Sequence, residues 1–131
     1  MMKKFFVFCI AALSLAGCHD SLEERAKKDT EMYTLKKCPT PIIYNERTDS
    51  IVFEPDTRTL HYHLSLFNEA DDDAVIALVK DKKTANLLEI LKNDMQRKAY
   101  KDEGFNFRYT YVSGKNPKKV YIDVIFKKGD Y

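Results

Sequence analysis

The sequence predicts a small α+β domain in which a four-stranded antiparallel sheet, built from two hairpins, carries helices packed on one face. Two observations favour this fold class. Apolar and polar residues alternate over two pairs of segments, and turn-forming residues join the members of each pair. Between the two pairs, apolar residues recur at helical spacing. Strict alternation along a strand requires one buried and one polar face, so we expect the helices to cover only one side of the sheet.

The first hairpin is predicted around the turn sequence Glu54-Pro55-Asp56-Thr57-Arg58. Before this turn, Ile51 and Phe53 alternate with other residues, and after it an apolar series alternates with a polar one. We expect Ile51 to pair with Tyr62 and Phe53 with Leu60, because this register collects the large apolar side chains on one face. The apolar series after the turn is Leu60, Tyr62, Leu64 and Leu66, and the polar series is His61, His63 and Ser65.

The second hairpin is predicted around the turn at Ser113-Gly114-Lys115-Asn116-Pro117. The register that we expect pairs Phe105 with Phe126, Phe107 with Val124, Tyr109 with Ile122, and Tyr111 with Val120. The same register places Arg108 opposite Asp123 on the other face. Two independent patterns, one apolar and one ionic, therefore agree on this hairpin.

One or two helices are predicted between the hairpins. Asp71-Asp72-Asp73 provides a helix start, because acidic residues are favourable at the N-terminal end, and Thr84 is a second possible cap. The stripe formed by Leu87, Leu88, Leu91, Met95 and Ala99 is predicted to face the core. The three aspartates lack the spacing and the central glycine of an EF-hand calcium loop. An earlier, ragged helical pattern must end at Cys38-Pro39, because a proline disfavours helix at the preceding residue.

The N-terminal residues have the layout of a secretory signal. Lys3 and Lys4 precede an apolar run over residues 5–15, and the run leads into Leu15-Ala16-Gly17-Cys18. This ending resembles the lipobox of bacterial lipoprotein precursors. The resemblance implies that Cys18 carries lipid and becomes the N-terminus after cleavage. The apolar run of about eleven residues is too short for a membrane-spanning helix, whereas a cleaved signal without lipid stays open as an alternative.

These features predict three segments: a lipoprotein signal peptide over residues 1–17, a lipid-anchored polar tether over residues 18–30, and a single α+β domain over residues 31–131. The lipoprotein resemblance also implies a location in the bacterial cell envelope, anchored in the membrane through the lipid. It implies sorting to the outer membrane, because the residue after the cysteine, His19, is not aspartate.

Charge and cysteine content narrow the function classes. Removal of Lys3 and Lys4 with the signal reduces the 22 basic residues to 20, which equals the number of acidic residues. A neutral mature chain does not indicate a nucleic-acid binder. Cys9 leaves with the signal and Cys18 takes the lipid, so no internal disulfide is possible. Cys38 remains as a free thiol that is buried, paired between chains or reactive.

The predicted domain also resembles small bacterial envelope proteins of unknown activity. The residues that carry this resemblance are Cys38-Pro39, Thr48-Asp49-Ser50, Leu60-His61-Tyr62-His63-Leu64 and the tyrosine-rich last hairpin. The resemblance spans most of the mature chain and implies an envelope location, but it implies no activity.

The polar face of the sheet is the candidate functional surface. We expect Tyr62, Tyr109 and Tyr111 to point towards the core and Tyr121 to point outward. An outward aromatic side chain near arginine and histidine is typical of a protein-binding patch. We therefore predict an interaction module for an envelope protein partner, with no cofactor and an oligomeric state that the sequence leaves open. The predicted interaction face comprises His61, His63, Arg108, Tyr121 and Asp123.

Two other function classes are alternatives for the same face. His61 and His63 lie on one side of a strand, about 6.5–7 Å apart, so they could converge on a metal ion or another ligand. A zinc site needs a third protein ligand, and Asp123 could supply it only if the two hairpins adjoin. Enzyme signatures such as a phosphate-binding glycine loop or a Gly-x-Ser-x-Gly elbow do not occur, so we predict neither catalytic residues nor enzymatic activity.

Overall fold

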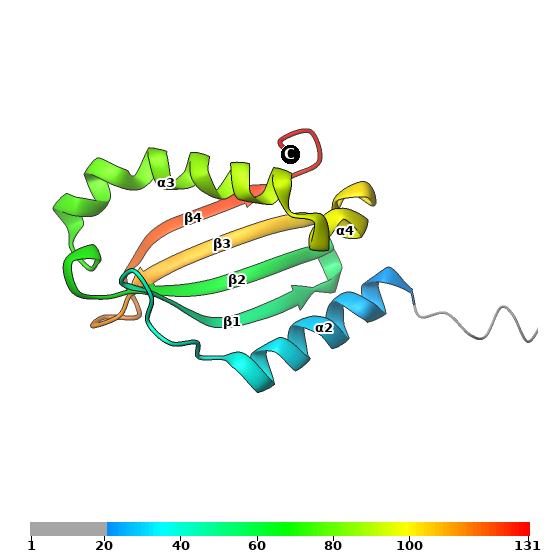
Figure 1. The fold of residues 1–131 in the computed structure, drawn as a ribbon, viewed down its shortest axis with the longest axis horizontal. Helices are drawn as coiled ribbons and strands as arrows, with labels where there is room; N and C mark the ends of the chain where they lie inside the picture. Colours follow the sequence, from blue (N-terminus) through cyan, green and yellow to red (C-terminus); the bar gives the residue numbers. More distant parts are fainter. Residues whose placement is uncertain (1–20) are drawn as a thin grey trace, which may run out of the picture.

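The computed structural model describes residues 21–131, which form a four-stranded sheet with helices on one side (Figure 1). The predicted signal peptide and the lipobox lie outside the described residues. Short 3₁₀ turns occur at Pro55–Thr57, Asn68–Ala70 and Met95–Arg97. The helices and strands, in chain order, are α2 (Leu22–Lys37), β1 (Glu46–Glu54), β2 (Thr59–Leu66), α3 (Asp73–Asn93), α4 (Lys98–Asp102), β3 (Asn106–Ser113) and β4 (Val120–Phe126).

Helix α2 begins earlier than the sequence predicts. The Ser21 side chain accepts a hydrogen bond from the Glu24 N–H at 3.2 Å and caps the helix, which therefore starts at Leu22. Ala26 and Thr30 are buried against the sheet. Residues 22–30 consequently belong to the folded domain and not to the predicted tether. The helix ends at Lys37, as the Cys38-Pro39 sequence predicts.

The sheet is mixed, which corrects the prediction of a purely antiparallel sheet. Its strand order is β1-β2-β3-β4, and the central pair, β2 and β3, is parallel. The two hairpins therefore lie side by side through their inner strands. All strand pairs within the hairpins are antiparallel, as predicted.

A single long helix explains the parallel central pair. Asp72 caps α3 by accepting hydrogen bonds from the N–H groups of Ala74 and Val75, and the helix then continues through Thr84 without a break. Its 21 residues span about 31 Å, comparable with the about 26 Å of an eight-residue strand. The helix thus returns the chain to the end of the sheet where β2 began, and β3 runs parallel to β2.

The predicted register of the first hairpin is confirmed. Ile51 pairs with Tyr62, and Phe53 pairs with Leu60. The register shifts between Thr48 and Ser50, so Asp49 is an extra residue in a β-bulge.

The predicted register of the second hairpin is wrong by two residues. Phe107 pairs with Phe126, Tyr109 with Val124, and Tyr111 with Ile122. A shift of two keeps every side chain on its predicted face, because side chains alternate with a period of two. The bulge after Tyr111 breaks this rule: Val120, predicted to pair with Tyr111 on the core face, pairs with Val112 instead and is 55% exposed.

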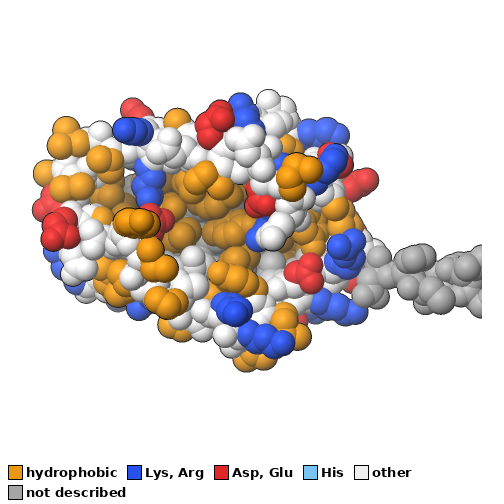
Figure 2. Space-filling model, viewed as in Figure 1, with side chains coloured by type: hydrophobic (Ala, Val, Ile, Leu, Met, Phe, Trp, Pro, Cys, Tyr) orange, Lys and Arg blue, Asp and Glu red, His pale blue; other side chains and the backbone are white. Residues whose placement is uncertain are grey.

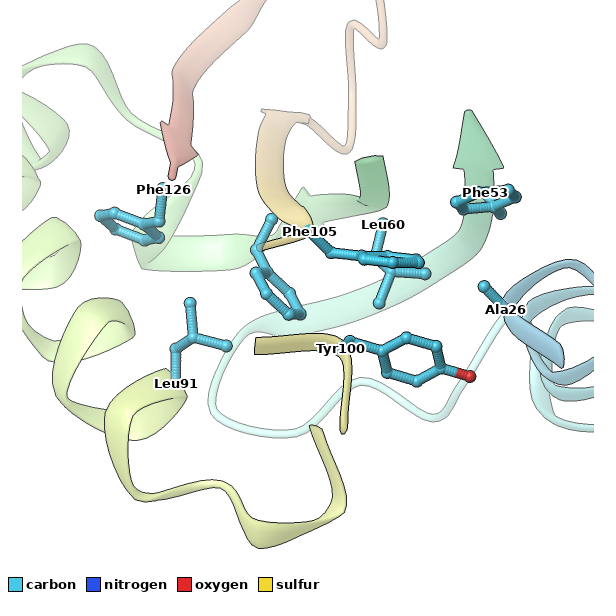
Figure 3. Packing of buried hydrophobic residues seen from close by; sticks show 8 residues of the cluster. Ala26, Phe53, Leu60, Leu91, Tyr100, Phe105 and Phe126 are labelled. Carbon is cyan, nitrogen blue, oxygen red and sulfur yellow. The ribbon is translucent and has the colours of Figure 1, made fainter. Parts of the chain in front are cut away.

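The core lies between the helices and one face of the sheet, as predicted. Figure 3 shows that its side chains come from all layers, with Ala26 on α2, Leu91 on α3 and Tyr100 on α4 directed towards the strand residues. The core face includes Tyr62, Tyr109 and Tyr111, as the sequence predicts. The buried members of this main cluster are Ala26, Phe53, Leu60, Leu91, Tyr100, Phe105, Phe107 and Phe126.

The predicted core stripe is correct only in part. Leu91 is buried, and Leu87 and Leu88 pack against the core, but Met95 is 74% exposed. The reason is that α3 ends at Asn93, so Met95 lies in the following 3₁₀ turn and Ala99 in α4. None of the helices among residues 21–131 is both long and apolar enough to cross a membrane.

Helix α2 also protects the free edge of the sheet. The Thr34 hydroxyl accepts a hydrogen bond from the Ile51 N–H at 3.0 Å and donates one to the Ile51 carbonyl at 2.9 Å. Unpaired edge groups are a template for pairing with another chain, so this contact blocks one position of the β1 edge.

Candidate functional site

The sheet face opposite the helices brings four of the five predicted face residues together. Because β2 pairs with β3, the two hairpins contribute neighbouring residues to continuous rows across the sheet. One row is Val52, His61, Arg108 and Ile125, and the next row is Ser50, His63, Thr110 and Asp123. We call these two rows, together with Glu54, the histidine face.

His61 is held at both ring nitrogens. Its Nδ1 lies 3.0 Å from Glu54 Oε2, and its Nε2 lies 2.8 Å from Thr110 Oγ1. The residue is only 6% exposed although no described helix covers this face, because its neighbours in the rows enclose it. Two good hydrogen bonds fix the orientation of the ring.

Asp123 is the shared acceptor at the other end of the network. Arg108 donates from Nε to Oδ1 at 2.8 Å and from Nη2 to Oδ2 at 2.6 Å, which is a bidentate pair. Thr110 also donates to Oδ1, at 3.0 Å. The hydrogen bonds from Arg108 hold the pKa of the Asp123 carboxyl below its usual range, and Asp123 raises the pKa of Arg108. Thr110, and not Arg108, is directly opposite Asp123, so Arg108 reaches it diagonally.

These contacts define where the protons lie. The hydroxyl of Thr110 donates to ionised Asp123, so its oxygen accepts from His61 and Nε2 carries a hydrogen. The Nδ1 of His61 then faces Glu54 Oε2 at 3.0 Å, which joins Glu54 to the same network. The network is therefore a continuous chain of donors and acceptors from Glu54 to Arg108.

His63 lies beside His61 in the same strand. The two ring centroids are 3.9 Å apart, and the planes are tilted by 30°. Burial lowers the pKa of His63, and the charge of His61 lowers it further. His63 thus favours its neutral form in the folded protein while part of its ring stays accessible.

Tyr121 does not belong to this face, which corrects the prediction that it points outward. It is the extra residue of the β4 bulge, because Tyr111 pairs with Ile122 while Val112 pairs with Val120. Tyr121 is 9% exposed and packs with Leu66 and Ile76 on the helix side. Its hydroxyl donates to Asp71 Oδ1 at 2.7 Å.

The acid, imidazole and hydroxyl of Glu54, His61 and Thr110 have the order of a hydrolytic triad, but the proton of the hydroxyl is placed differently. In a triad the hydroxyl donates to the imidazole, whereas Thr110 donates to Asp123. The hydroxyl lies in a row of the open sheet face and lines none of the four cavities described on the surface of residues 21–131. The network therefore suits recognition better than nucleophilic attack.

The geometry of His61 does not favour the alternative of a metal site on this face. Both ring nitrogens of His61 are engaged in hydrogen bonds. In the part of the chain that the structure describes, no three His, Cys, Asp or Glu residues cluster in a way that could hold a metal ion.

Comparison with known proteins places this domain in a family. The profile of the domain of unknown function DUF8479 matches residues 21–122. The chain belongs to this family. The match begins at the residue that caps α2, so the DUF8479 domain includes the helix that the sequence assigned partly to a tether.

A solved structure shares the fold of this DUF8479 domain. It is the crystal structure of a protein from Pseudomonas aeruginosa described as a presumed secreted protein, with a TM-score of 0.65. The two sequences are 16% identical, and the match covers 86% of this chain and 98% of the other. A search of curated proteins gave no match.

Sequence reasoning missed the roles of Glu54, Thr110 and Asp49 on this surface. Asp49 accepts hydrogen bonds from Ser65 and from Arg47 Nε, the latter at 2.7 Å, and so extends the polar face beyond His63. The alternation along each strand does place Thr110 on the same face as Arg108, and it could have placed Glu54 beside Val52, but it does not reveal their contacts with His61. The bulge that positions Asp49 has no comparable signal in the sequence.

Cys38 is half-buried and free, which is not the full burial favoured for a lone cysteine. Burial and the nearby charge of Asp49 raise the pKa of its thiol. A raised pKa disfavours the thiolate, so the DUF8479 domain does not hold Cys38 in an activated state.

Proposed function

We propose that this protein is a lipid-anchored lipoprotein of the bacterial envelope whose DUF8479 domain is a non-catalytic module that binds an envelope protein through the histidine face. The lipobox Leu15-Ala16-Gly17-Cys18 supports the anchor, and the identity of His19 supports an outer-membrane location. The description of the structural neighbour as a presumed secreted protein is compatible with a place outside the cytoplasm.

The start of α2 sets how far the domain can stand from the lipid. Only His19 and Asp20 separate Cys18 from the cap at Ser21, so the three steps along the chain give a reach of roughly 10 Å even when fully extended. The domain is therefore held close to the membrane surface. A partner would meet the histidine face beside the membrane and not at the end of a long tether.

The observation that carries the binding proposal is a preorganised network on a sheet face without a helical cover. Glu54, His61, Thr110, Asp123 and Arg108 are already fixed by mutual hydrogen bonds. A partner would therefore lose little side-chain freedom in contacting them, which favours affinity.

The edges of the same surface provide apolar contact area. Val52 and Ile125 end the first row and are 44% and 43% exposed. Arg108, between them, is a residue type enriched at interface hot spots. The histidine face therefore combines exposed apolar area with a preorganised arginine, and protein interfaces use both.

The anchor and the binding face can be tested separately. Cys18→Ser should abolish incorporation of labelled palmitate and release the protein from the membrane fraction, whereas Cys38→Ser should change neither.

For the histidine face, Ile125→Asp should remove a discrete complex seen when solubilised envelopes are separated by size. Leu78→Asp on the outside of α3, where Leu78 is 86% exposed, is the matched control. Loss of the complex in both variants, or in neither, would contradict the proposed face.

A further inference from the structure

A cavity of about 270 Å³ lies on the helix side, between α2 and the segment that leads from α3 into α4. Its floor is formed by Ile51, Leu60 and Tyr62, and Ala26 and Tyr33 contribute apolar wall from α2. Figure 2 shows the hollow on this side of the molecule, where hydrophobic side chains are visible between the helices. The cavity faces away from the histidine face, so it is a separate site.

Arg97 is the polar residue of this cavity with the most unused hydrogen-bond donors. Its Nε donates to the Tyr62 hydroxyl at 3.0 Å, and it has no ion pair with any of residues 21–131. Asp94 acts on it through its charge but uses its carboxylate to cap the following 3₁₀ turn through the Gln96 N–H. Arg97 is half-buried, and its terminal guanidinium nitrogens are not among the buried atoms of residues 21–131 that lack a partner.

The support around Arg97 is rigid. The rings of Tyr62 and Tyr109 stack with centroids 4.8 Å apart and planes within 12°. Tyr100 donates to Asp29 Oδ2 at 3.1 Å and so ties α4 to α2 across one wall. The Tyr62 hydroxyl accepts from Arg97, and its own proton is free to donate to a second acceptor beside the guanidinium.

We propose that this cavity binds a small carboxylate that carries a compact apolar group. A guanidinium with free terminal donors matches a carboxylate in geometry and charge. The hydroxyl of Tyr62 adds a donor at the same place, while Ile51, Leu60 and Ala26 offer apolar surface to the remainder of the ligand. An apolar hollow with a few converging polar groups is the usual form of a ligand site.

Titration with phenylacetate, followed by the amide resonances of the isotope-labelled domain, tests this inference. We expect saturable shifts around Arg97 and Tyr62, and no such shifts with phenylacetamide, which has the same shape without the charge. Arg97→Gln should weaken binding about tenfold or more, as expected for loss of a hydrogen-bonded charge. Lys98→Gln, next to it on the exposed side, should leave binding unchanged.

Tyr62→Phe is a second variant that should still fold, because it removes only the hydroxyl and keeps the ring that stacks on Tyr109. It should weaken phenylacetate binding several-fold while the spectrum stays native. Equal binding of phenylacetate and phenylacetamide, shifts that map elsewhere, or no shifts at all would overturn the proposal.

Discussion

The imidazole rings of His61 and His63 lie with their centroids 3.9 Å apart, on the one sheet face that no described helix covers. The two rings are nonetheless in different situations. His61 is enclosed and bonded at both nitrogens, whereas His63 is partly accessible and its pKa is lowered. The closeness of two ionisable rings has consequences for stability that can be measured.

The lowered pKa of His63 predicts a loss of stability in mild acid. Its folded-state pKa lies below the ordinary value of about 6.5, so the unfolded chain binds more protons as the pH falls through this range. The free energy of unfolding should therefore decrease below about pH 6.5 and level off beneath the folded pKa. His63→Gln should flatten this part of the profile, measured by urea unfolding between pH 7.5 and 5. An unchanged slope in His63→Gln would show that His63 is not the group responsible.

Thr110 should contribute to stability through both of its contacts. Thr110→Val keeps the shape but removes the acceptor for His61 and the donor to Asp123. We expect a loss of roughly 1–3 kcal/mol in the free energy of unfolding, because a buried ring nitrogen is left without a partner. Thr84→Val on α3, where no comparable network exists, should change it by less than about 0.5 kcal/mol. Equal effects in the two variants would contradict the network.

The ion pair of Arg108 and Asp123 should contribute less than its short distances suggest. Both side chains are about one-third exposed, so solvent screens the pair. A double-mutant cycle with Arg108→Met and Asp123→Asn should give a coupling of about 1 kcal/mol or less, and salt should reduce it. A coupling that is insensitive to salt would mean that the pair is more deeply desolvated than its exposure indicates.

The inward position of Tyr121 predicts that its partner Asp71 is structural. Burial alone would raise the pKa of Asp71, but hydrogen bonds from Ser113, Tyr121 and the Lys115 N–H reverse the effect and lower it. Tyr121→Phe and Asp71→Asn should both lower the urea midpoint, Asp71→Asn by more, because it also disturbs the contact with Lys115. Asp71 should stop contributing as the pH falls below its ordinary pKa of about 4 towards its folded value. A Tyr121→Phe variant as stable as the wild type would indicate that the hydroxyl is not held there.

Thr34 should keep the domain from associating through its β1 edge. Thr34→Val removes both contacts to the Ile51 backbone and exposes an N–H and a carbonyl on an edge strand. We expect a concentration-dependent increase in mass by light scattering. Thr30→Val is the control, because the Thr30 hydroxyl bonds only within α2. Association of both variants to the same extent would contradict a specific role for Thr34.

The parts of the fold that were predictable are those set by local alternation. The register of the first hairpin could be predicted because its two strands flank the 3₁₀ turn at Pro55–Thr57 directly. The register of the second hairpin could not be predicted. Its longer turn is compatible with registers that differ by two residues, and the bulge at Tyr121 interrupts the alternation. The Arg108–Asp123 contact was still found, since a shift of two leaves both residues on one face and within reach of a long side chain.

The parallel pairing of β2 and β3 is a tertiary property that neither hairpin encodes. It follows from the uninterrupted length of α3, which the possible cap at Thr84 obscured in the sequence. The same pairing creates the candidate site, because it places His61 beside Arg108 and His63 beside Thr110. The face residues were therefore predictable one by one, while their network was not.

Photo-crosslinking in living cells from position 63 of the full-length chain tests the central claim most directly. A probe at His63 lies in the middle of the histidine face, and a matched probe at Ile90, which is exposed on α3, reports the opposite side. We predict one discrete adduct with an envelope protein from position 63, none from position 90, and loss of the first adduct in Ile125→Asp. Adducts from position 90 alone, or from neither position, would contradict the assignment of this face as the binding surface.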